Sequence, residues 1–344
     1  MKTTCKSIIF LLVIILSLSL FVGREIKADD KETKKPTVAL VANQKFGDKG
    51  PMDDMALGLE RAKKDFNIKT LTVEALVPGE YEEQVRGLAE EGVDLVMVTF
   101  FSMIEIIKKV APDYPDTKFS IIFGLEDLKI PNVGTVLFEI WEPYYVAGAI
   151  ASKLTKTGKM AHIAGSDDPI LNANYNAFLD GARSMDPDIT VARVVAGTFE
   201  DPAKGKEIAY MLYDSGIDII VTDCAATTLG VIEAAIEKGK FVIGDSVDHS
   251  PKAPSNIIVS TLCNFGQAVY NEIDDFVKGK WQGGLKAASL ANKGVGISQM
   301  DSFLENAPED LAAKMPEVKK LAENLINDIN SGKITIERKP EIQK

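Results

Sequence analysis

The sequence predicts an α/β protein with two lobes, each a doubly wound parallel sheet with helices on both faces. One observation is that short, almost wholly apolar runs such as VDLVMVTF at 93–100 alternate with segments of helical spacing. Strands that are apolar on both faces are typical of parallel sheets covered on both sides. A second observation is length, since 344 residues exceed one ordinary domain. With 46% hydrophobic and 26% charged residues, the composition is that of an ordinary globular protein.

The N-terminal residues predict export. Lys2 and Lys6 precede an apolar run from Ile8 to Val22, and a small residue, Ala28, follows it. The run has about 15 residues, fewer than the roughly 20 that a spanning helix needs, so we predict a signal peptide over 1–28 that is cleaved rather than retained. The mature chain is expected to be extracytoplasmic, either secreted or associated with the membrane through its N-terminal segment. No cysteine follows the apolar run at the place where a lipid would attach.

The first lobe begins after a charged tether at 29–36. The run VALVAN at 38–43 predicts a strand, and the segment 55–66 has helical spacing with charges on its other face. The same cycle predicts the later elements of this half. The expected strands are 71–77, 93–100, 119–125 and 133–139, and the expected helices are 82–91 and 104–110.

The second lobe repeats the rhythm after the small-residue helix expected at 144–154. Its predicted strands are 159–165, 189–197, 217–225, 240–245 and 256–262, with helical segments such as 203–215 between them. We predict a first lobe of residues 37–138 with about 263–285, and a second lobe of 139–262 with about 286–300. Residues 301–344 are expected to form a helical tail that the sequence assigns to neither lobe.

The acidic balance of the chain argues against nucleic-acid binding. The formal net charge is −11, which repels phosphate backbones and anionic lipid. Nucleotide cofactors are not expected either, because neither G-x-x-x-x-G-K-[ST] nor G-x-G-x-x-G occurs. The loop QKFGDKG at 44–50, after the first strand, has its glycines at a different spacing.

Catalytic and metal-binding constellations are missing from the sequence. His162 lies in an apolar strand, where a satisfied core residue is the expectation, and His249 lies in a polar loop. No G-x-S-x-G elbow occurs. The adjacent carboxylates at 53–54 and 167–168 are expected to cap helices rather than to hold a metal ion. We therefore predict a protein that is not an enzyme and that carries no cofactor.

Only two cysteines, Cys224 and Cys263, follow the predicted signal peptide. A single disulfide between them is one interpretation, and two buried free thiols are the favoured one. Ligands of open α/β sheets lie beyond the carboxyl ends of the strands. The loops after Asn43, Phe100, Asp223 and Asp245 are therefore expected to form the site.

Several strings, in this order along the chain, resemble the basic membrane protein family of ABC transporter solute-binding proteins, also called the purine nucleoside receptor type. The resemblance covers nearly all of the mature chain. The strings are VALVAN with GDKG, APDYPDTKF, the 144–154 helix with TGK, GTFEDPAKGKE, GID, and FVIG with Asp248.

This resemblance implies a type I periplasmic-binding-protein fold, in which a hinge joins two lobes and a small ligand is enclosed between them. It further implies an ABC permease as partner, action as a monomer, and a nucleoside or related polar solute as ligand. A sensory receptor of the same fold is the alternative, and a secreted α/β hydrolase is the third reading.

The resemblance also implies ligand-binding residues. Phe199 matches the family's stacking phenylalanine, and Phe101 matches an aromatic residue after the third strand. Asn43 stands at a polar ligand contact, Asp48 in the first-loop motif, and Asp248 at the last Asp of a G-x-D-x-D stretch.

The first loop departs from the family pattern. Pro51 and Met52 stand where the family has a phenylalanine and an asparagine, so a stacking ring and an amide are missing. Phe46 is the alternative source of a ring.

The second lobe departs as well. Ser246 occupies the position of the family's first Asp, with Asp245 one place earlier, and Cys263 replaces a ribose-binding Lys. A hydrogen bond to a charged group contributes about 1.5–3 kcal/mol. We therefore expect a ligand other than an ordinary purine nucleoside, or weaker binding of one. Asp223 and Trp141 complete the candidate ligand-binding residues, Asp223 at a strand end and Trp141 near the first hinge crossing.

Overall fold

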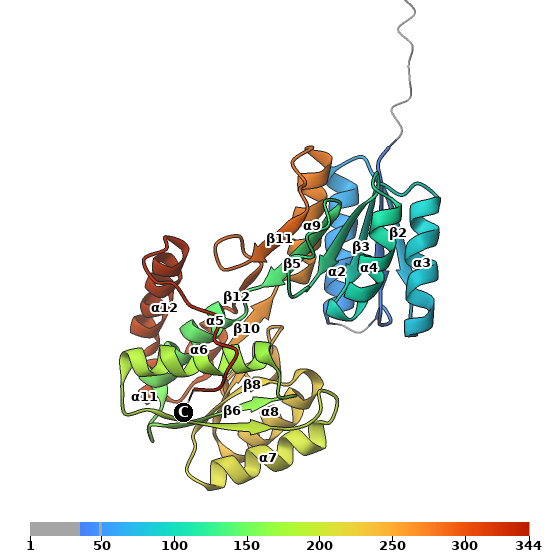
Figure 1. Ribbon diagram of the computed structural model, residues 1–344. Coiled ribbons are helices and arrows are strands. Elements are labelled where there is room, and N and C mark those ends of the chain that lie inside the picture. The colour runs from blue at the N-terminus through green and yellow to red at the C-terminus, as the bar shows by residue number, and fades with distance from the viewer. Residues whose placement is uncertain (1–34, 48–49, 344) are drawn as a thin grey trace, which may run out of the picture. The chain divides into compact units, whose positions relative to one another are not determined.

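The computed structural model describes residues 35–47 and 50–343. The predicted signal peptide, most of the tether and Asp48 lie outside the described residues. Residues 36–344 form one compact unit (Figure 1). Among the described residues, no helix combines the length and the apolar character needed to cross a bilayer.

The first sheet is six-stranded and parallel, with the order β11-β5-β4-β3-β1-β2. Its strands are β1 Thr37–Ala42, β2 Lys69–Glu74, β3 Leu95–Thr99, β4 Lys118–Ile122, β5 Val133–Phe138 and β11 Gly284–Ala288.

The second sheet is also six-stranded, with the order β12-β10-β9-β8-β6-β7. Only its edge strand β12 runs antiparallel to its neighbour, β10. Its strands are β6 Lys159–Ala164, β7 Thr190–Val195, β8 Ile219–Asp223, β9 Phe241–Gly244, β10 Ile257–Cys263 and β12 Val295–Ile297.

The helices complete the two layers around each sheet. The α-helices are α2 Pro51–Asp65, α3 Pro78–Glu90, α4 Ile104–Val110, α5 Trp141–Leu154, α6 Pro169–Met185, α7 Pro202–Asp214, α8 Thr228–Lys238, α9 Phe265–Val277, α10 Asp301–Asn306, α11 Glu309–Ala312 and α12 Met315–Asn330, and the 3₁₀ turns are η1 Phe101–Met103, η2 Ala111–Asp113, η3 Ala225–Thr227 and η4 Ser250–Lys252.

Alternating strand residues enter different cores, as a doubly wound sheet requires. In β1, Leu40 packs into the core that contains α2 and α9, whereas Val41 packs into the core under α3 and α4. In β8, Val221 faces the core of α5 and α6, whereas Ile220 faces that of α7 and α8. Because successive side chains of a strand point to opposite faces, an apolar run is buried on both sides. The predicted fold class of two doubly wound lobes is confirmed.

Two strands had no counterpart in the sequence prediction. β11 and β12 lie at sheet edges, and β11 alternates half-buried with exposed residues before the buried Ala288. Short edge strands lack the continuous apolar run that identifies a central strand. They matter for connectivity, because the chain passes between the sheets after β5, after β10 and again between β11 and β12.

The C-terminal segment lies against the helices of the second sheet. α12 packs on α5, and Lys314 Nζ donates to the Lys153 carbonyl. Beyond α12, the Asn176 amide on α6 donates to the carbonyls of Lys339 and Glu341 over 2.7 Å each. The tail that the sequence left unassigned is thus held by α5 and α6.

Candidate ligand-binding site

A cavity of about 430 Å³ lies where the carboxyl end of β10 meets the start of α2. It is lined by both apolar side chains and carboxylates. The lining residues are Gly50, Pro51, Asp53, Asp54, Leu57, Ser246, Val247, Asp248, Leu262, Cys263, Asn264 and Phe265. Three of the predicted site residues, Ser246, Asp248 and Cys263, are therefore together in this cavity.

Phe199 presents an exposed ring at the carboxyl edge of the second sheet. Its side chain is 40% exposed. The ring packs against Gly165, where a Cβ atom would lie 2.3 Å from the nearest ring carbon. The loop that carries Phe199 is bonded to the turn after β8, because Thr227 N–H donates to the Phe199 carbonyl over 3.2 Å. The ring is therefore a preformed platform rather than a loose loop side chain.

Aromatic side chains also gather at the carboxyl edge of the first sheet. Phe101, 48% exposed, lies 6.5 Å from Phe123 between ring centroids. Phe123 in turn contacts Phe100, Phe138 and Phe265. Both Phe100 and Phe123 have positive φ, 61° and 69°, a conformation that is costly for bulky residues and is concentrated at functional sites.

Both carboxylate oxygens of Asp245 accept hydrogen bonds from other residues of the protein. The carboxylate is 3% exposed, and its Oδ1 accepts from the hydroxyls of Thr222 and Thr228 at 2.9 and 2.5 Å. Its Oδ2 accepts from the backbone N–H groups of Cys224 and Ala225 at 3.1 and 2.9 Å. These contacts hold the loop after β8, so the geometry gives this predicted ligand residue a structural role.

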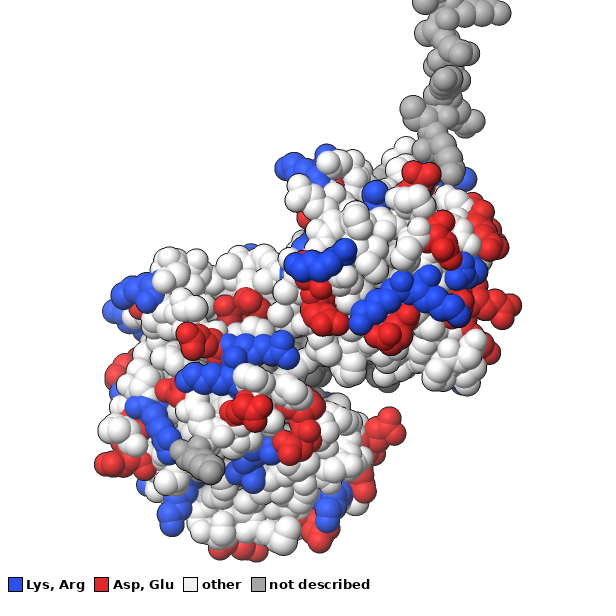
Figure 2. Space-filling view, viewed as in Figure 1, with Lys and Arg blue, Asp and Glu red and all other residues white. Residues whose placement is uncertain are grey.

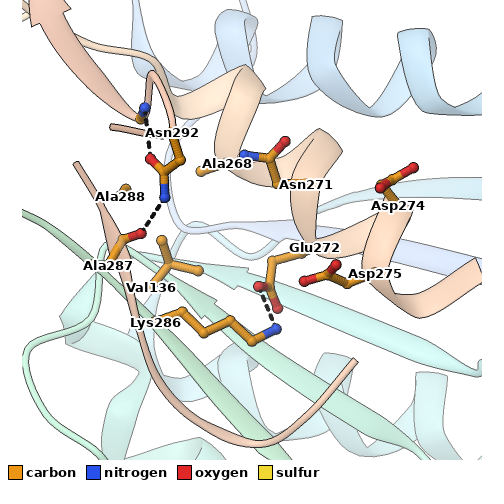
Figure 3. A pocket seen from close by; sticks show the side chains of 11 residues that line it. Val136, Ala268, Asn271, Glu272, Asp274, Asp275, Lys286, Ala287, Ala288 and Asn292 are labelled. Atoms are coloured by element: carbon orange, nitrogen blue, oxygen red, sulfur yellow. Dashed lines mark hydrogen bonds and ion pairs between the residues drawn. The ribbon is translucent and has the colours of Figure 1, made fainter. Parts of the chain in front are cut away.

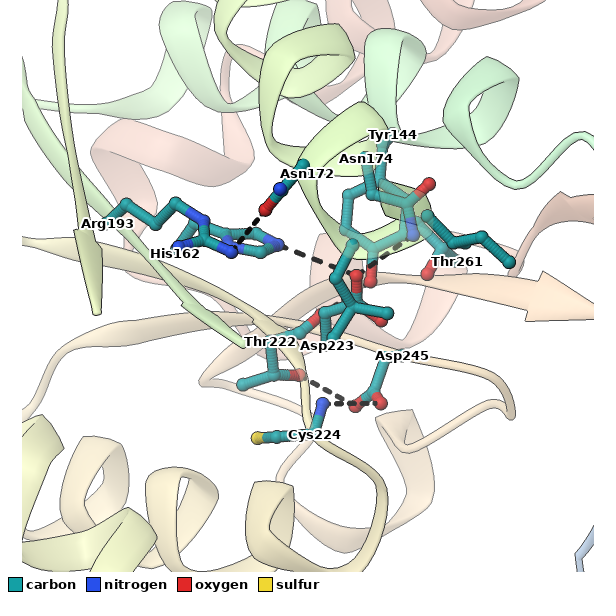
Figure 4. A network of polar contacts seen from close by, with 12 residues as sticks. Tyr144, His162, Asn172, Asn174, Arg193, Thr222, Asp223, Cys224, Asp245 and Thr261 are labelled. Carbon is teal, nitrogen blue, oxygen red and sulfur yellow. Dashed lines mark hydrogen bonds and ion pairs between the residues drawn. The ribbon is translucent and has the colours of Figure 1, made fainter. Parts of the chain in front are cut away.

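Asp223 retains solvent contact, in contrast to Asp245. It ends β8, and its side chain is 14% exposed. Figure 4 shows its carboxylate beside His162 and Asn174. Oδ2 accepts from Asn174 Nδ2 over 2.9 Å and lies 3.6 Å from His162 Nε2. Burial raises the pKa of this carboxyl, and Asp245 adds to the rise, while His162 and Asn174 oppose it.

The other predicted residues lie in varied surroundings. Asn43 Oδ1 accepts from the Thr99 hydroxyl, and its Nδ2 donates to Ser102, so its amide is engaged at the edge of the first sheet. The backbone N–H of Phe46 donates to Glu74. Trp141 is buried at the start of α5, where its Nε1 donates to the Ile336 carbonyl over 3.1 Å, so it contacts the C-terminal segment.

Sequence reasoning did not identify His162, Asn174 and Gly165 as residues of the site at the carboxyl edge of the second sheet. His162 is fully buried, as predicted, yet neither ring nitrogen has a hydrogen-bond partner among the described residues. Asn174 lies on α6, far from Asp223 in sequence, and no spacing rule joins the two. The one available signal was Gly165, because a glycine at a strand end often marks close approach of another group.

Both thiols are free and buried, which confirms the favoured reading of the cysteines. Burial raises the pKa of both Cys224 and Cys263, and the carboxylates Asp245 and Asp223 add to the rise. The thiolate is the reactive form, so a raised pKa suppresses alkylation.

For the chain from Asp29, which lacks Cys5, we expect fewer than one thiol per native chain to react with Ellman's reagent within minutes at mildly alkaline pH, and both Cys224 and Cys263 to react in guanidinium. The absorbance of the released thiolate counts the thiols that have reacted. Fast labelling of the native protein would contradict the buried, protonated state of these two side chains.

A second cavity, of about 310 Å³, lies beside α9 and β11 (Figure 3). Its central carboxylate, Glu272, accepts from Ser120, Trp281 and Lys286 at 2.7–2.8 Å. Because these donors belong to the protein, the carboxylate is already satisfied and does not favour a ligand there. No group of three or more potential metal ligands occurs among the described residues.

On the face of the molecule drawn in Figure 2, acidic and basic side chains are interspersed.

Comparisons with known proteins agree with this architecture. The family model described as "ABC transporter substrate-binding protein PnrA-like" matches residues 35–330. Basic membrane protein B of Borrelia garinii subsp. bavariensis is 30% identical over 310 residues, which span 87% of this chain and 90% of that relative.

Two solved structures share the fold. The solute-binding protein of an ABC transporter system from Aeropyrum pernix K1 has a TM-score of 0.74 at 24% identity, covering 89% of this chain and 94% of its own. The corresponding protein from Conexibacter woesei has a TM-score of 0.69 at 23% identity, covering 88% and 99%.

The expected type I periplasmic-binding-protein fold is confirmed by these neighbours, and the resemblance to the basic membrane proteins is confirmed by the family model and the relatives. A family of substrate-binding proteins also bears out the prediction that the chain is not an enzyme. The chain therefore belongs to the PnrA-like family of ABC transporter substrate-binding proteins.

Proposed function

We propose that this substrate-binding protein encloses a planar, nucleoside-like ligand between its two lobes and presents it to an ABC permease for import. The observation that carries the proposal is the Phe199 ring, 40% exposed and seated on Gly165 at the carboxyl edge of the second sheet. A rigid, exposed aromatic face at this edge suits the flat face of a heterocycle.

The first lobe supplies the opposing aromatic surface in this proposal. Phe101 is its most exposed ring, and Phe100 and Phe123 support it. A ligand that contacts both aromatic surfaces does so only when the lobes close on it. Binding then shifts the population toward the closed state, which a permease can distinguish from the open one.

The proposal keeps the predicted organisation of the chain. The lobes are 37–138 with about 263–285 and 139–262 with about 286–300, the last boundary lying close to the end of β11 at Ala288. The protein acts outside the cytoplasm as a monomer, after export directed by the segment 1–28. The cavity beside α2 and β10 gives Asp248, Ser246 and Cys263 access to the polar part of the ligand.

A thermal-shift screen of the chain from Asp29 tests the proposal. The probes are adenosine, guanosine, cytidine and uridine, with glucose and leucine as other solute classes. A ligand that binds only the folded state raises the apparent melting temperature by mass action. A shift with a nucleoside supports the proposal, and a shift with glucose or leucine alone overturns the nucleoside part of it.

Phe199→Ala tests the stacking platform. Stacking of a base on an aromatic side chain contributes about 1–3 kcal/mol, so we expect the Kd of the best nucleoside to rise about 30-fold in isothermal titration calorimetry. Phe66→Leu is the matched control, because Phe66 follows α2 and packs on Tyr270. If Phe199→Ala and the unaltered chain bind the nucleoside with equal affinity, Phe199 does not contribute to ligand binding.

A further inference from the structure

We infer that Asp223 is a specificity-determining residue that recognises N–H donors on the edge of the stacked ligand ring. The inference rests on the proposed function, since it assumes a heterocycle on the Phe199 platform. It adds the class of ligand: a ring that carries an exocyclic amino group on the edge facing β8.

Asp223 lies at the same strand end as the residues that hold the Phe199 ring. Gly165, on which the Phe199 ring is seated, donates its N–H to the Asp223 carbonyl over 2.9 Å. Thr227, four residues after Asp223, donates its N–H to the Phe199 carbonyl. The platform and the carboxylate are thus held to the same strand end, so a ring stacked on Phe199 brings its edge toward Asp223.

Only one of the two carboxylate oxygens of Asp223 accepts a hydrogen bond from a described residue. Asn174 occupies Oδ2 and His162 lies beside the same oxygen, whereas no described residue donates a hydrogen bond to Oδ1 (Figure 4). With the side chain still 14% exposed, Oδ1 is the accessible oxygen. Asp245, only 22 positions further along the chain, has both oxygens filled by internal donors. Of these two neighbouring carboxylates, Asp223 alone has accepting capacity left.

The ionised form of Asp223 is costly in this environment. A mostly buried carboxylate with one oxygen lacking a donor is unfavourable when ionised, and burial raises the pKa of Asp223. A donor from the ligand relieves that cost, whereas a carbonyl oxygen at the same place repels the carboxylate. Sites built to hydrogen-bond an N–H group reject analogues that lack it far more strongly than apolar pockets reject a missing methylene.

Two positioning residues follow from the same geometry. Asn174 fixes one oxygen of Asp223, and its own Oδ1 is buried without a hydrogen-bond partner among the described residues. His162 is enclosed between the rings of Tyr144 and Tyr175, at 6.1 and 5.7 Å between centroids. Neither residue needs to touch the ligand, because both act through the orientation of the Asp223 carboxylate.

The test uses pairs of probes that differ only in an exocyclic amino group: adenosine with purine riboside, and guanosine with inosine. Titration calorimetry on the chain from Asp29 is expected to give a Kd at least tenfold lower for the amino member of one pair. In Asp223→Asn that ratio should fall below about twofold, because the amide that replaces the carboxylate can keep its oxygen toward Asn174 and turn an N–H₂ group toward the ligand. Asp188→Asn, in the exposed turn after α6, should leave the ratio unchanged.

The outcomes separate this inference from the proposed function. Binding of the nucleosides with no discrimination in either pair overturns the role of Asp223 and leaves the proposed function standing. A tenfold ratio that survives in Asp223→Asn also overturns it. Absence of binding by these four purines, and by cytidine and uridine in the thermal-shift screen, overturns the proposed function and the inference with it. If Asp223→Asn fails to fold, the pair comparison on the unaltered chain still overturns the inference when neither pair is discriminated.

Discussion

Asp245→Ala is expected to lower the free energy of unfolding by about 4 kcal/mol, because it leaves one buried and one partly buried backbone donor without an acceptor, at about 1–3 kcal/mol each, and removes two further hydrogen bonds. The donors are the N–H groups of Cys224 and Ala225, and the further bonds come from the hydroxyls of Thr222 and Thr228. Urea unfolding followed by far-UV circular dichroism measures the change as a shift of the midpoint at constant slope.

Asp245→Asn tests whether the lost hydrogen bonds cause the destabilisation expected in Asp245→Ala. Its amide oxygen can accept from the two N–H groups while the two threonine hydroxyls rotate to accept from its N–H₂ group. We expect more than half of the lost stability to return. Asp214→Ala, whose carboxylate is exposed and paired only with Lys238 among the described residues, should cost less than about 1 kcal/mol. Equal losses in Asp245→Ala and Asp214→Ala would show that Asp245 does not hold the loop.

Gly181→Ala is expected to lower the free energy of unfolding by about 3 kcal/mol, the upper part of the range for overpacking. α5 and α6 approach closely, and a Cβ atom on Gly181 would lie 1.9 Å from the Tyr145 carbonyl oxygen. On the facing helix, a Cβ on Gly148 would lie 2.0 Å from the Phe178 carbonyl oxygen. Both obstacles are backbone atoms, so the helices must separate to admit a methyl group.

Gly87→Ala is the matched control, since Gly87 lies inside α3 with nothing within 4 Å of an added Cβ. That substitution should stabilise the protein by about 0.5–1 kcal/mol through helix propensity. Calorimetric unfolding of the two variants should therefore move the melting temperature in opposite directions. A rise for both would mean that the α5 and α6 contact adapts without cost.

The sequence by itself determined the fold class and the family of this protein. Central strands such as β3 and β8 are apolar except at their carboxyl ends, and a run of that kind is stable only in a sheet covered on both faces. The ordered strings of the family likewise need no coordinates. The edge strands β11 and β12 could not be predicted, because their half-exposed residues carry no strong period.

Only the tertiary structure decided which polar residues of the site are available. Asp223 ends one apolar strand and Asp245 follows another, and the sequence made both of them ligand candidates. Their difference depends on side chains brought from other elements: four donors converge on Asp245, whereas Asn174 reaches a single oxygen of Asp223. Hydrogen-bond satisfaction is a property of three-dimensional neighbours, and so residue type and spacing along the chain do not determine it.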